Sequence, residues 1–133
     1  MSRPKVVVVR GHQANLMELR AWEHLRDDFD ITVLVTKRGE SGISDLDVPK
    51  RIVATRRDLL PNGGVGDMAV HLPGDGYRHL EAAVANADIV HSAELGPWLS
   101  AQPAKLKARF DYRLVLTYWE PIPFHHAYRT KRA

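Results

Sequence analysis

Four consecutive valines at positions 6–9 constrain the fold more than any other feature of this chain. A strand with one solvated face alternates apolar and polar residues, whereas a strand covered on both faces is apolar at every position, as in a parallel sheet. The run is far shorter than the roughly 20 residues that span a bilayer. We therefore expect a buried strand over 5–10, ended by Gly11, in a parallel α/β fold.

The rest of the chain alternates between short apolar runs and helical spacing. These patterns predict further strands over 31–36, 51–55, 88–91 and 113–118. They predict helices over about 15–26, from near 77 to 87, and over 95–109, and a polar loop over 37–47. Asn15 and Glu18 have the spacing of a capping box at the first helix. One domain over 1–133 is expected: a doubly wound, Rossmann-like parallel sheet in three αβα layers, with strand order 3-2-1-4-5.

Composition narrows the function classes. The chain has 133 residues, of which 44% are hydrophobic and 26% charged, values typical of a folded domain. It contains no cysteine, which excludes disulfides, thiolate nucleophiles and cysteine-based zinc sites. His125 and His126 are adjacent and would not share a helix face, so no metal site is expected. No signal-like apolar segment follows the N-terminal basic residues, and we expect a cytoplasmic protein.

Positive charge is concentrated toward the C-terminal end of the sequence, although the net charge is only +3. We favour a solvated face of ordinary helices as the explanation. Peripheral contact with an anionic membrane surface remains a weaker alternative. No nucleic-acid-binding motif accompanies the charge, so nucleic acid is not an expected partner. Residues 105–133 contain only two acidic residues, Asp111 and Glu120, but seven basic ones: Lys105, Lys107, Arg109, Arg113, Arg129, Lys131 and Arg132.

Candidate site residues follow three of the predicted strands. In a doubly wound sheet, ligands bind beyond the carboxyl ends of the strands, where the strand order reverses. That point lies between the first and fourth strands, with the fifth beside it. We expect one rim formed by residues after the first strand (Gly11, His12, Asn15), after the fourth (His91, Glu94) and after the fifth (Trp119, Glu120).

Most of these residues also have a structural interpretation. Gly11 permits either a tight turn or the close approach of a ligand, and His12 is either a loop histidine or an acid/base group. His91 continues the fourth strand directly, which favours a core histidine. For Glu94, a favourable charge at a helix start and a functional role remain equally open.

The two remaining candidates differ in balance. For Trp119, packing is favoured over a role as a sugar platform. Glu120, held between a strand and two prolines, has the strongest functional case of the seven candidates, and we assign it to catalysis.

Several nucleotide-binding signatures are absent. The residues after the first strand read R-G-H-Q-A-N rather than G-x-G-x-x-G, which disfavours a dinucleotide coenzyme. The chain has no G-x-x-x-x-G-K-[ST] phosphate loop. A response-regulator receiver domain would require paired acids after the first strand, where Gly11 and His12 stand. No bound cofactor is therefore expected.

Two segments carry a family resemblance. They are D-I-V-H-S-A-E-L-G-P-W over 88–98 and L-V-L-T-Y-W-E-P-I-P-F over 114–124. With the loop after the first strand, they resemble the N-terminal, acceptor-side domain of retaining GT-B glycosyltransferases, the glycosyltransferase group 1 or family 4 class. The resemblance implies transfer of a sugar from a nucleotide-sugar donor, a co-substrate, to a sugar acceptor with retention of anomeric configuration.

The sequence departs from the family pattern at three points. The family has a glycine pair after the first strand, where this chain has only Gly11. Trp119 occupies the position of the family's histidine after the fifth strand, whereas Glu120 matches the acidic position that follows. The family binds the nucleotide-sugar through a C-terminal domain that these 133 residues do not contain.

Three further expectations follow from the resemblance and its departures. Because a two-domain enzyme completes its site by closure, we expect this chain alone to be inactive. The alternative is a stand-alone, non-catalytic Rossmann-like binding or scaffolding domain. Self-association as a homo-oligomer through the cleft-facing surface also remains open.

Overall fold

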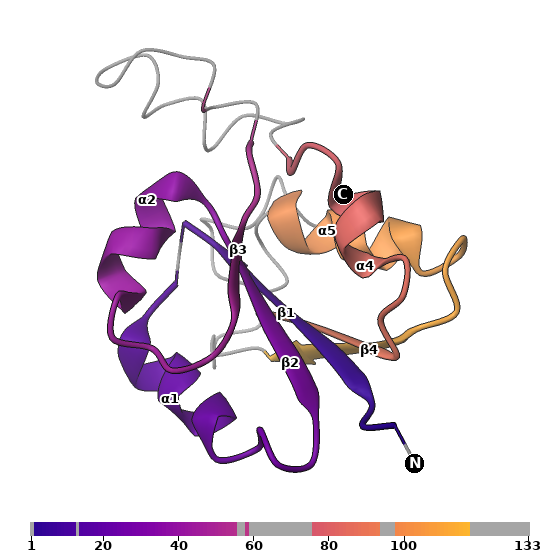
Figure 1. Ribbon diagram of the computed structural model, residues 1–133. Helices are drawn as coiled ribbons and strands as arrows, with labels where there is room; N and C mark the ends of the chain where they lie inside the picture. The colour runs from indigo at the N-terminus through magenta and orange to yellow at the C-terminus, as the bar shows by residue number, and fades with distance from the viewer. Residues whose placement is uncertain (1, 13, 56–57, 59–75, 94–97, 118–133) are drawn as a thin grey trace, which may run out of the picture.

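The central feature is a five-stranded sheet in which every strand pair is parallel (Figure 1). The computed structural model describes residues 2–12, 14–55, 58, 76–93 and 98–117. The strand order, β3-β2-β1-β4-β5, confirms the prediction. The strands are β1 (Lys5–Gly11), β2 (Asp30–Val35), β3 (Lys50–Ile52), β4 (Ile89–Ala93) and β5 (Arg113–Thr117).

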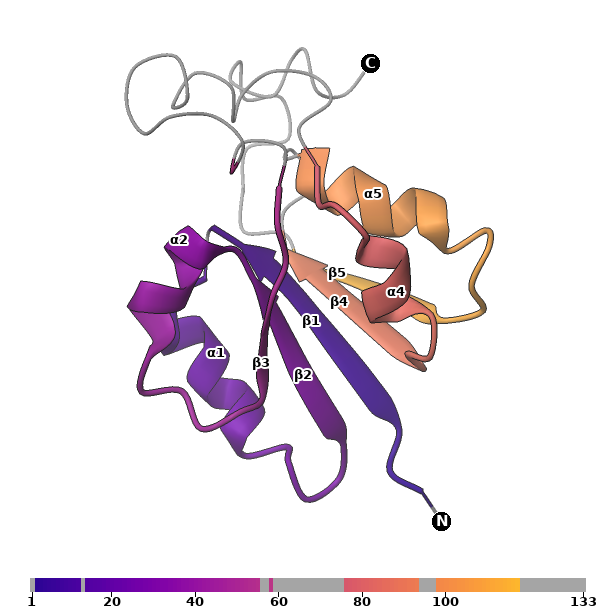
Figure 2. The same cartoon turned by 45° about the horizontal axis from the view of Figure 1, so that its top comes forward.

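Helices cover both faces of the sheet, as expected for a three-layer αβα fold (Figures 1 and 2). One face carries α1 and α2, and the other carries α4 and α5. This division follows from right-handed crossovers, because β1, β2 and β3 progress in one direction and β4 and β5 in the other. The helices are α1 (Leu16–Glu23), α2 (Lys37–Glu40), the 3₁₀ helix η1 (Ser41–Ile43), α4 (Leu80–Val84) and α5 (Trp98–Leu106).

The valine run is buried on both faces of the sheet. Val6 and Val8 pack with Leu19 in a core beneath α1, while Val7 and Val9 pack in a second core that contains residues of α4. All four valines are at most 7% exposed. A strand without polar alternation is thus stabilised by two separate apolar cores.

The predicted loop over 37–47 is wrong, because α2 and η1 occupy most of it. The Thr36 hydroxyl caps α2 by accepting a hydrogen bond from the Gly39 amide at 3.3 Å. A side chain at Gly39 would collide with the Gly11 carbonyl oxygen. Glycine therefore lets this short helix pack against the end of β1.

Other element boundaries shift by a few residues. β3 ends at Ile52, and Thr55 instead forms an isolated antiparallel bridge with Tyr77. That bridge precedes α4, which begins at Leu80 after His79 adopts a left-handed φ of 59°. α5 ends at Leu106, three residues before its expected end, and the expected start over 95–97 lies outside the described residues.

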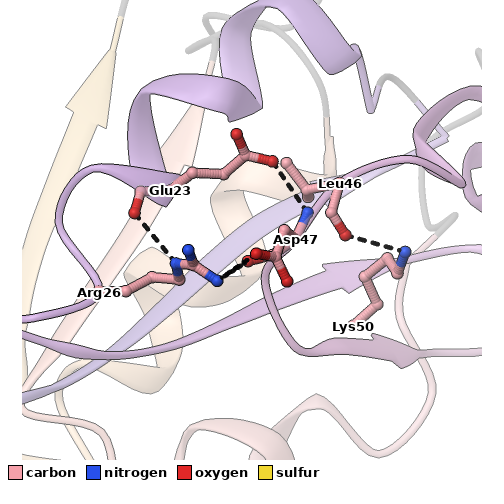
Figure 3. Close-up of polar contacts among 5 residues, drawn as sticks. All are labelled: Glu23, Arg26, Leu46, Asp47 and Lys50. Atoms are coloured by element: carbon pink, nitrogen blue, oxygen red, sulfur yellow. Dashed lines mark hydrogen bonds and ion pairs between the residues drawn. The ribbon is translucent and has the colours of Figure 1, made fainter.

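Polar contacts hold the end of α1 against the segment that leads to β3 (Figure 3). The Arg26 guanidinium donates to the Asp47 carbonyl at 2.8 Å and pairs with the Asp47 carboxylate at 2.5 Å. The Glu23 carboxylate accepts from the Asp47 amide at 2.8 Å.

Lys50 donates through Nζ to the carbonyls of Ile43, Ser44 and Leu46 at 3.0–3.2 Å. These contacts fix the η1–β3 connection below α1.

Candidate functional site

Gly11 ends β1 beside β2, and two structural constraints require a glycine there. Its φ is +58°, in the region that residues with side chains rarely adopt. A Cβ at this position would also collide with the hydroxyl of Tyr77. The space next to the Gly11 Cα is therefore filled by Tyr77, which favours the turn interpretation of this glycine.

His12 and Asn15 lie between β1 and α1. His12 is half-buried directly after the strand. Asn15 is the N-cap of α1, and its side-chain oxygen accepts from the Met17 amide at 2.9 Å. The cap at Asn15 is confirmed, but Glu18 pairs its carboxylate with the Arg10 guanidinium. The Glu18 carboxylate thus pairs with a residue of β1 rather than, as the capping-box spacing predicted, with the start of the helix.

His91 lies within β4, which continues to Ala93. The expectation that His91 follows the strand is wrong, because β4 pairs with β5 as far as the Ala93–Thr117 register. The half-buried His91 ring has Nε2 2.7 Å from the Thr117 hydroxyl. It also makes an edge-on contact with Trp22, with ring centroids 5.1 Å apart. His91 therefore faces α1.

The electrostatic surroundings keep His91 neutral. Burial lowers the pKa of its imidazole below the usual 6.5, and the positive charge of Arg10 lowers this pKa further. Its Nδ1 atom is buried and has no hydrogen-bond partner among the described residues.

The remaining candidates, Glu94, Trp119 and Glu120, lie outside the described residues. The strands that precede them are described, however. Ala93 and Thr117 are register partners at the carboxyl ends of β4 and β5, and β1 runs parallel beside β4. The chain therefore leaves all three strands at the same edge of the sheet, which the convergence of the candidate residues requires.

A cavity beside this edge contains residues that the sequence reasoning missed. Its volume is about 310 Å³, and it lies between α1 and the neighbouring face of the sheet. Two kinds of signal could have revealed it: an arginine that continues the valine strand, and a stripe at helical spacing along α1. The cavity is lined by Arg10, Glu18, Leu19, Ala21, Trp22, Leu25, His91 and Thr117.

An ion pair is part of the lining of this cavity. The Arg10 side chain is 8% exposed, and that of Glu18 is 35% exposed. A guanidinium this deeply buried requires a compensating charge, which the Glu18 carboxylate supplies. The part of the cavity lined by this ion pair is consequently polar but close to neutral in net charge.

Two further properties concern partners. Within the described ranges, no three potential metal-ligating side chains are grouped, and no helix is long and apolar enough to cross a membrane. Lys105, Lys107, Arg109 and Arg113 are exposed around the end of α5 and the start of β5. The other basic residues of the predicted cluster, Arg129, Lys131 and Arg132, lie outside the described residues.

Comparison with known proteins gives no relative: no family model, curated protein or solved structure matches the chain.

Proposed function

We propose that this chain is the acceptor-side domain of a retaining GT-B glycosyltransferase. Its role is to hold a sugar acceptor at the carboxyl edge of the sheet, while a second domain of the enzyme binds the nucleotide-sugar donor. Among its residues, we assign Glu120 to the chemical step. Gly11, His12, Asn15, His91, Glu94 and Trp119 are proposed to shape the acceptor side.

The supporting observation is the meeting of β1, β4 and β5 at one edge. The two segments that resemble the family run through β4 and β5, and these strands are register partners up to Ala93 and Thr117. Beside them, β1 ends at Gly11 at the point where the strand order reverses. This is the location at which doubly wound sheets bind ligands.

The described residues suit binding better than bond cleavage. Breaking the bond to a nucleoside diphosphate requires groups that stabilise the departing charge. In the described part of the site, the Arg10 guanidinium is already paired with Glu18. The proposal therefore leaves stabilisation of the diphosphate to the donor-binding domain.

The test is a transfer assay on the protein as its gene encodes it. A panel of nucleotide-sugars and sugar acceptors is incubated with the enzyme, and NMR of the product gives the anomeric configuration. We expect transfer with retention of configuration, and no turnover by residues 1–133 alone. Glu120→Gln should lower kcat by about 10²–10⁴-fold, the usual contribution of a positioned proton-transfer group.

The matched control is Glu40→Gln, which neutralises an exposed carboxylate at the end of α2. It should leave kcat unchanged. Transfer with inversion, or robust turnover by residues 1–133 alone, would contradict the proposal. Binding without any transfer, unaffected by Glu120→Gln, would favour the stand-alone binding domain instead.

A further inference from the structure

We infer that the cavity between α1 and the sheet binds a glycoside, with the sugar ring at a polar end and an apolar substituent at the other. The inference deepens the proposed function, on which it rests for the choice of a sugar derivative as ligand. The cavity volume of about 310 Å³ is at the lower end of the range for small-molecule sites. It therefore suits one ring with a short substituent.

The polar end consists of groups that bind hydroxyls. Glu18 presents a carboxylate that is one-third exposed, and Thr117 contributes a hydroxyl from the end of β5. A carboxylate accepts hydrogen bonds from the hydroxyls of a sugar ring, and a threonine hydroxyl can both donate to them and accept from them.

The charge balance at this end favours a neutral ligand over a phosphate. Arg10 is paired with Glu18, and His91 is uncharged at neutral pH because burial and Arg10 lower its pKa. A phosphate entering the cavity would meet the Glu18 carboxylate and would have to compete with it for Arg10. Neutral hydroxyl groups encounter no such repulsion.

The opposite end of the cavity is apolar. Glu18 and Trp22 lie four residues apart on one side of α1, and Leu25 lines the cavity from the turn that follows the helix. Glu18 lies in the first turn of α1, whereas Leu25 lies beyond its C-terminal end at Glu23. Leu25 is 37% exposed.

One more exposed apolar side chain lies on this face of the sheet, outside the cavity lining. Val115 pairs with His91 in the β4–β5 register, so its side chain emerges on the same face of the sheet. Val115 is 46% exposed. Trp22 lies between the two ends, where its indole can pack against the C–H surface of a sugar ring. Polarity thus falls along the cavity in the same sense as along a glycoside with an alkyl or aryl substituent.

The test compares two series of ligands on the 133-residue chain. Methyl and hexyl glycosides of glucose, mannose and galactose are titrated and followed by ligand-observed NMR. For the best sugar, we expect a Kd on the order of 1 mM for the methyl glycoside. The hexyl glycoside should bind about tenfold more tightly, because burying only two of its extra methylenes gives that factor.

Three variants locate the site. Thr117→Val removes a hydroxyl without changing shape, and we expect it to weaken binding of both ligands about fivefold. Trp22→Leu should weaken both by a similar factor. The control is Met17→Ala, because Met17 is on the same helix but 84% exposed and outside the cavity lining; it should not change either Kd. Thermal unfolding shows that each variant is folded.

Four results would overturn the inference. They are no binding of any glycoside, equal affinity for the methyl and hexyl series, unchanged affinity in both cavity variants, and displacement of the glycoside by low-millimolar inorganic phosphate. Glycoside binding in a protein that transfers no sugar would support the cavity and contradict only the proposed function. Sugar transfer without glycoside binding in this cavity would support the proposed function and contradict the inference about the cavity.

Discussion

At the scale of single residues, Gly11 illustrates how a site position can be fixed by folding. Its left-handed φ and the adjacent Tyr77 hydroxyl both exclude a side chain. We predict that Gly11→Ala lowers the free energy of unfolding by about 2–4 kcal/mol, from the combined cost of backbone strain and overpacking. Urea denaturation measures this loss.

Gly42→Ala is the matched control for that substitution. A Cβ at Gly42 would make only an ordinary 3.5 Å contact with the Ala14 carbonyl, and its φ is not left-handed. The change should leave stability within about 0.5 kcal/mol of the wild type, or raise it slightly. Equal losses in the two variants would contradict the role assigned to Tyr77.

At the scale of elements, the short α2–η1 unit depends on polar contacts rather than on length. Lys50 donates to three carbonyls at the end of η1. Lys50→Met keeps most of the apolar stem but removes these bonds, and we predict a loss of about 1–2 kcal/mol in unfolding free energy. Chemical denaturation measures it.

Lys37→Met provides the comparison. Lys37 is exposed in the first turn of α2, where a positive charge is not favoured by the helix dipole. Its replacement should change stability by less than about 0.5 kcal/mol. A loss as large as that of Lys50→Met would show that the carbonyl contacts of Lys50 are not the source of its effect.

The difference between elements that were predicted and those that were missed has a physical basis. The valine strand was predictable because all four of its valines are buried, on one face of the sheet or the other. The 37–47 segment was not, since a cap at Thr36 and the contact of Gly39 with Gly11 create its helix. The spacing of hydrophobic residues in the sequence indicates neither contact.

At the scale of the whole molecule, topology was the most predictable property and the site the least. The alternation of strands and helices, interpreted as a doubly wound sheet, predicted the observed order β3-β2-β1-β4-β5. That topology also brings the ends of β1, β4 and β5 to one edge. The Arg10–Glu18 ion pair was not predicted, because the sequence pattern placed Arg10 at the end of a strand and assigned Glu18 to helix capping. Pairing between side chains of different elements depends on how those elements pack, which local sequence patterns do not specify.

Amide chemical-shift mapping of the 133-residue chain tests most directly where the acceptor binds. On addition of the methyl glycoside that binds best, we predict shifts concentrated at the carboxyl edge of the sheet and the adjoining part of the cavity, in residues 10–12, 18, 22, 91–93 and 117. Addition of a nucleotide-sugar should give little change there. Shifts at the opposite edge, around Lys5, Asp30 and Asp88, would contradict the placement of an acceptor site at the point where the strand order reverses.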